Sequence, residues 1–142
     1  MTQTVTLTIP DALYAPIQRA AEATKQPVEA VLLNVLQTSL PSLAGLPADV
    51  QAELVRLEML DNETLWRVMI ETVPVDKQRA LEALLARNQS GELSEAEREE
   101  LAALQKAADL VMLRKARAAV LLRFRGRRLP TLVELRQLGI AA

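Results

Sequence analysis

The sequence predicts a mostly α-helical protein that begins with one β-strand and carries one long helix in its C-terminal part. Residues 4–9 alternate between polar and apolar side chains, which is the pattern of a half-buried strand. Further along, apolar residues recur at spacings of three and four, as they do on one face of a helix. Half of the residues are hydrophobic, but there is only one Trp, one Tyr and one Phe. The apolar mass is therefore mainly Ala, Leu and Val, and the first two favour helix strongly.

The N-terminal strand is expected to pair with a second copy of itself. Its apolar positions are Val5, Leu7 and Ile9, and its polar β-branched positions are Thr4, Thr6 and Thr8. Pro10 ends it, since proline cannot donate to a strand ladder. No second strand-like segment follows in the sequence, and a strand with unpaired backbone groups is unstable. The same strand of a second chain is therefore its expected partner.

Two helices are predicted next, over residues 11–24 and 28–40. The second places Val28, Val31, Leu32, Val35 and Leu36 at positions i, i+3, i+4, i+7 and i+8, which makes a wide apolar face. That face would pack against its twin in a dimer, although an ordinary core helix would use the same residues. The sequence does not separate these two interpretations.

The succession of strand, helix and helix over residues 1–40 resembles the ribbon-helix-helix family of small DNA-binding dimers. The resemblance implies an intermolecular ribbon whose outward residues Thr4, Thr6 and Thr8 read bases in the major groove. It also implies that the backbone at Pro27 and Val28 binds a phosphate. The turn between the helices holds Lys25 where that family usually has glycine, so Lys25 is predicted to adopt a positive φ. The alternative is a ribbon that dimerises without touching DNA.

The same resemblance supplies a dimer interface. Its residues would be Val5, Leu7, Ile9, Val31, Leu32, Val35 and Leu36. Residues 41–47, with two prolines and a glycine, are interpreted as a linker and domain boundary.

Residues 48–142 are predicted to form a helical, partner-binding region. Two short helices are expected within residues 48–73, another over 74–88, a long one over 95–125 and a short terminal one after Thr131. Ser94 with Glu97, and Thr131 with Glu134, have the spacing of capping boxes. The long helix is apolar on more than one side, so we expect other helices or a partner to cover it.

Composition argues against an enzyme. The chain has no cysteine and no histidine, which excludes disulfides, thiol catalysis, the usual zinc sites and the commonest general base. No glycine-rich phosphate loop or nucleophile elbow is present, and the acidic residues at 95–100 are typical of a solvated helix face. We therefore expect no metal and no cofactor. Without a signal segment or an apolar run of roughly 20 residues, a soluble cytoplasmic protein is expected.

Charge is distributed unevenly along the chain. Residues 1–47 carry a net charge of −1, residues 48–100 carry −7, and residues 101–142 carry +7. Three interpretations of the basic end remain open: a solvated helix end, an ion-pair surface for residues 48–100 or for a partner, and a phosphate contact. The residues predicted to bind a partner are Arg114, Arg117, Val120, Phe124, Arg125 and Arg128.

The combination of a ribbon-helix-helix module with a helical region resembles the architecture of type II antitoxins, and this resemblance implies an antitoxin-like transcriptional regulator. Residues 1–40 would form a homodimer and bind double-stranded operator DNA, and residues 48–142 would hold a protein partner, such as a toxin, by helix-in-groove contacts. The alternative is a helical adaptor or assembly subunit that the ribbon only dimerises, with no role in DNA binding.

Overall fold

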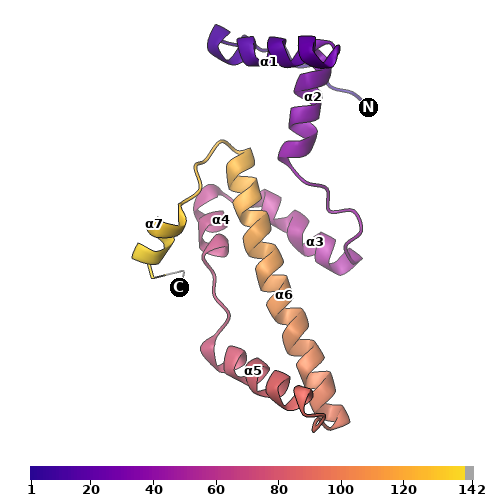
Figure 1. Ribbon diagram of the computed structural model, residues 1–142, viewed down its shortest axis with the longest axis vertical. Helices are drawn as coiled ribbons and strands as arrows, with labels where there is room; N and C mark the ends of the chain where they lie inside the picture. The colour runs from indigo at the N-terminus through magenta and orange to yellow at the C-terminus, as the bar shows by residue number, and fades with distance from the viewer. Residues whose placement is uncertain (140–142) are drawn as a thin grey trace. The chain divides into compact units, whose positions relative to one another are not determined.

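The computed structural model describes residues 1–139, and these divide into two compact units (Figure 1). The first comprises residues 1–42 and the second begins at Leu43. The division falls inside the segment that the sequence predicts to be a linker. Each unit is described by itself below.

The first unit is a pair of helices, α1 (Asp11–Thr24) and α2 (Val28–Ser39). Both helices lie where the sequence predicts them, and α2 ends one residue early. Lys25 joins them with a φ of 54°, as predicted. The backbone N–H of Gln26 donates to the Ala21 carbonyl over 3.0 Å, and the backbone N–H of Lys25 donates to the Ala21 and Glu22 carbonyls. The left-handed turn therefore satisfies carbonyls at the end of α1.

The predicted strand is wrong. Residues 1–10 have no regular secondary structure, and residues 1–139 contain no strand and no sheet. Val5 and Leu7 remain 76% and 72% exposed. The alternation of side chains is only half of what a strand requires, because the backbone also needs a hydrogen-bonding neighbour. Residues 1–139 supply no such neighbour, so a ribbon-helix-helix fold is not seen in them.

The second unit is built along one long helix. Its elements are α3 (Ala48–Arg56), the 3-10 helix η1 (Leu57–Met59), α4 (Asn62–Met69), α5 (Val75–Gln89), α6 (Glu95–Phe124) and α7 (Leu132–Gln137). The helix α6 contacts α3, η1, α4 and α5. In Figure 1, α5 lies along the N-terminal half of α6, and α3 and α4 lie beside its C-terminal half.

Burial in this unit is concentrated near the two ends of α6. Leu84, Leu93 and Leu101 form one apolar cluster with Leu81 and Leu104, where α5 meets the start of α6. The other buried side chains come from α3, η1, α4 and the C-terminal half of α6. They are Leu54, Leu57, Leu65, Val68, Ala118, Leu121 and Leu122. The middle of α6 therefore keeps an uncovered side.

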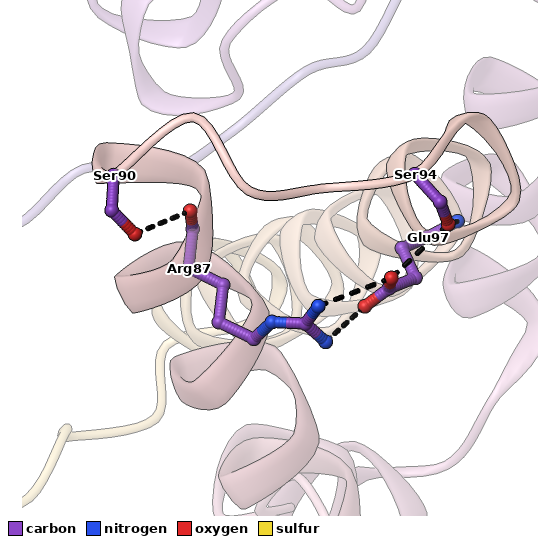
Figure 2. A network of polar contacts seen from close by, with 4 residues as sticks. All are labelled: Arg87, Ser90, Ser94 and Glu97. Atoms are coloured by element: carbon purple, nitrogen blue, oxygen red, sulfur yellow. Dashed lines mark hydrogen bonds and ion pairs between the residues drawn. The ribbon is translucent and has the colours of Figure 1, made fainter.

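A polar network closes the turn between α5 and α6 (Figure 2). The Ser94 hydroxyl accepts a hydrogen bond from the backbone N–H of Glu97 over 3.2 Å and so caps α6. The Glu97 carboxylate pairs with Arg87 at the end of α5. Partial desolvation raises the pKa of Glu97, but hydrogen bonds from Ser94 and the charge of Arg87 outweigh it. The pKa of Glu97 therefore lies below its ordinary value.

We expect Ser94→Ala to lower the free energy of unfolding by about 1 kcal/mol, because the mutation removes the N-cap of α6. Ser90→Ala is the matched control, since the Ser90 hydroxyl donates only to the Arg87 carbonyl at an exposed helix end. Urea denaturation followed by circular dichroism measures both variants. Equal losses in the two would contradict this role for Ser94.

Candidate protein-binding surfaces

Most of the basic residues of α6 that the sequence singles out are bonded within their own unit. Arg114 Nη1 lies 2.5 Å from Glu53 Oε1, and Arg117 Nη2 lies 3.2 Å from Glu58 Oε1. Arg117 is only 7% exposed. These two guanidinium groups tie α3 and η1 to α6. The packing thus joins part of the acidic middle of the sequence to its basic end.

Arg125 performs a different task at the end of α6. Its guanidinium donates to the carbonyls of Leu60 over 2.6 Å and Glu58 over 2.8 Å, and to Asn62 Oδ1 over 3.1 Å. These acceptors lie where η1 ends and α4 begins. One planar guanidinium thus satisfies two backbone carbonyls that no helical hydrogen bond reaches.

The remaining residues predicted to bind a partner differ in exposure and contacts. Val120 is half-buried, whereas Phe124 is 48% exposed. Arg128 Nη2 lies 2.9 Å from Glu134 Oε1 and fastens the start of α7. The predicted ion-pair surface therefore acts mainly within the chain.

We predict that Arg125→Ala lowers the free energy of unfolding by about 1–2 kcal/mol, because it leaves carbonyls near η1 without their donor. Arg123→Ala provides the comparison, since Arg123 is exposed and close in sequence. Its change should stay within about 0.5 kcal/mol. Thermal and urea denaturation of the two variants test this, and an Arg125→Ala protein as stable as the wild type would refute it.

A complete capping box begins α7. The Thr131 hydroxyl accepts from the backbone N–H of Glu134, and the Glu134 carboxylate accepts from the backbone N–H of Thr131. The hydrogen bond from the Arg128 side chain, followed by that from Thr131, holds the pKa of Glu134 below its ordinary value of 4.5. A carboxylate with a lowered pKa stabilises the folded state above its ordinary pKa, and this contribution disappears as pH falls through the lowered value.

We therefore expect the helix content of residues 132–137, as reported by their chemical shifts, to be constant from neutral pH down to about 5. It should decrease below the lowered pKa of Glu134. Nuclear magnetic resonance across this pH range measures the change. Glu134→Gln should remove the pH dependence by removing the titrating group. A wild-type α7 that is equally helical at pH 7 and pH 2 would show that the box does not stabilise it.

The first unit presents a second kind of surface, the apolar stripe of α2, which consists of Val28, Val31, Leu32, Val35 and Leu36. Its first three residues are half-buried, but Val35 and Leu36 are 57% and 60% exposed. The two helices meet at the Lys25 turn and then diverge (Figure 1). The stripe thus continues beyond the part of α2 that α1 covers.

The structure also locates the residues to which the ribbon resemblance gave a DNA-binding role. Thr4, Thr6 and Thr8 are exposed in the segment that precedes α1, while Pro27 is the N-cap of α2 and Val28 its first residue. Val5 and Leu7 are exposed and Ile9 is half-buried. The described residues show no ribbon that would present these threonines, and base reading by them stays a prediction.

A third surface is a groove between α3 and α6, which the residue patterns did not single out. It encloses about 630 Å³, and its apolar lining includes Leu46, Val50, Ala102, Leu110 and Leu113. Asp49, Glu53, Lys106 and Asp109 also line it. We refer to it as the α3–α6 groove. The one signal for it in the sequence was that α6 is apolar on more than one side.

Two kinds of site are missing from the part of the chain that the structure describes. Residues 1–139 contain no group of acidic side chains arranged to hold a metal ion. Among the same residues, no helix has the length and apolar character needed to cross a membrane. The candidate surfaces are therefore the apolar stripe of α2 and the α3–α6 groove.

The fold and these surfaces define a helical protein with exposed apolar faces among the described residues. Comparisons of the chain with family models, with curated proteins and with solved structures found no match. No family is assigned to the chain on this basis.

Proposed function

We propose that this protein is a helical adaptor in which residues 1–42 join two copies and the second unit holds a protein partner. The observation that carries the proposal is the uncovered apolar surface of the first unit. Ala21 is the only buried residue in this unit, whereas Leu13, Leu33, Val35 and Leu36 are between 57% and 62% exposed.

The small size of the first unit makes a covering partner necessary. A unit of about 40 residues buries too little surface to be stable by its own core, and usually depends on disulfides, a metal or oligomerisation. The chain has no cysteine, and the described residues hold no metal-binding group. We therefore propose oligomerisation as the means of stabilising the pair of helices.

The charge distribution of α2 allows a second copy of the helix to pack against it. In a two-fold dimer the same patch meets itself, so any charge on it opposes an identical charge. Glu29 is the only charged residue among the twelve of α2, and it lies in the first turn, away from the exposed end of the stripe. Two α2 helices can therefore pack their apolar stripes together without like-charge repulsion, as in a four-helix bundle.

Protein association is better supported than DNA binding. The regulator hypothesis depended on a paired ribbon, and the first unit has only two basic residues, Arg19 and Lys25, against three acidic ones. Affinity for DNA comes largely from the neutralisation of phosphates by basic side chains. The adaptor therefore replaces the antitoxin-like regulator as the proposed function.

Leu36→Glu should weaken self-association more than about 100-fold, because burial of an unpaired carboxylate costs several kcal/mol. Light scattering and sedimentation over a range of micromolar concentrations measure the effect. Gln37→Glu is the control, since residue 37 points away from the stripe by helical geometry and is exposed. It should leave the dimer intact.

Two outcomes would contradict the proposal. One is a wild-type protein that is monomeric throughout this concentration range. The other is a self-association that Leu36→Glu and Gln37→Glu weaken equally. A duplex DNA of mixed sequence, included in the same measurements, should not bind. Tight and salt-dependent binding to it would favour a nucleic-acid role instead.

A further inference from the structure

The α3–α6 groove is long enough to accommodate about three turns of one helix. The residues of α6 that line it run from Ala102 to Leu113, which at 1.5 Å per residue corresponds to about 16 Å, or three helical turns. Ala102, Lys106, Asp109 and Leu113 follow one another at spacings of four, three and four, so they lie along one face of α6. This face runs beside α3 and is not covered by it.

Polar contacts connect the elements that form the groove. Asp49 Oδ2 lies 3.4 Å from Lys106 Nζ, and Glu53 Oε1 lies 2.5 Å from Arg114 Nη1, so two ion pairs connect α3 to α6 along its length. At one end, the Gln51 side-chain amide donates to the Leu46 carbonyl over 2.8 Å and fixes the approach to α3. A preformed groove lowers the entropic cost of binding.

The groove holds one carboxylate that its ion pairs do not include, since Glu53 pairs with both Arg114 and Arg56 and Asp49 pairs with Lys106. Three carboxylates and one ammonium group line it. Asp49 and Glu53 are each paired, but Asp109 forms no ion pair with any described residue and is exposed. By helical geometry, Asp109 lies near the centre of the groove face of α6. A bound helix would therefore meet apolar side chains around one unneutralised carboxylate.

From the charge and shape of the α3–α6 groove, we propose that it binds a basic amphipathic helix of a partner protein. Apolar side chains of that helix at positions i, i+4 and i+7 would contact Val50, Leu110 and Leu113, and a Lys or Arg side chain would pair with Asp109. This inference rests on the proposed adaptor function and names the surface and the class of partner. It differs from the contact between copies, which uses α2.

The test uses the full-length chain and two fluorescent helical peptides about three turns long. Both carry leucines at i, i+4 and i+7, but one has lysines and the other glutamates beside them. Fluorescence anisotropy should show that the lysine peptide binds at least about tenfold more tightly than the glutamate peptide. Asp109→Lys should abolish or reverse this preference. Asp76→Lys, at an exposed site on α5, should leave it unchanged.

A second pair of variants tests the apolar part of the groove. Ala102→Glu places a carboxylate in the groove from an exposed position, and both peptides should lose binding. Ala107→Glu, on another side of α6, should have no such effect. Thermal denaturation checks that both variants are folded. The inference is overturned if neither peptide binds the wild type below about millimolar concentration, or if both bind equally.

Failure of this inference and failure of the proposed dimer give different results. Leu36→Glu should produce a monomer that still binds the lysine peptide, because α2 does not line the α3–α6 groove. A wild-type dimer that binds neither peptide would support the contact between copies and contradict only the proposed role of the groove. A wild-type monomer that binds the lysine peptide would support the groove and contradict the proposed dimer.

Discussion

The arrangement of the second unit depends on α6, because most of the elements that pack in this unit pack against it. Its N-terminal half carries α5 through an apolar cluster, and its C-terminal half carries α3, η1 and α4. Arginine side chains of α6 hold the latter group by reaching carboxylates and backbone carbonyls. Apolar burial provides the attraction, while the guanidinium groups specify which turn of α6 faces which part of η1.

The two units differ in how they bury apolar side chains. The second has a 30-residue helix to which short helices attach, and it buries leucines near both ends of that helix. The first has only two helices that diverge from a turn, so its apolar stripe extends past its own cover. Under the proposed function, the second unit presents the α3–α6 groove and the first unit associates with a second copy.

Local signals in the sequence predicted the helices well. The start of α1 after Pro10, the positive φ of Lys25 and the caps at Ser94 and Thr131 are all set by residues within one turn of each other. The strand failed because side-chain alternation is local but the partner of a strand is not. Helix termini could therefore be predicted from the sequence, whereas pairing could not.

The candidate surfaces show the same limit. The sequence singled out Arg114, Arg117 and Arg125, but nothing in the pattern indicated that Glu53, Glu58 and the Leu60 carbonyl would face them. The α3–α6 groove depends on how two helices that are far apart in the sequence lie together, so no local motif marks it. The apolar stripe of α2 was visible in the sequence, but the exposure of Val35 and Leu36 required the structure.

The most direct test of the account is amide hydrogen exchange of the wild-type chain, measured by mass spectrometry at a low and a high micromolar concentration. If the stripe of α2 is covered by a second copy, the amides of α2 exchange more slowly at the higher concentration, because association opposes their opening. The amides of α6 around the buried residue Leu121 should exchange equally at both concentrations. Exchange of α2 that does not depend on concentration, in a chain that remains monomeric, would contradict the account.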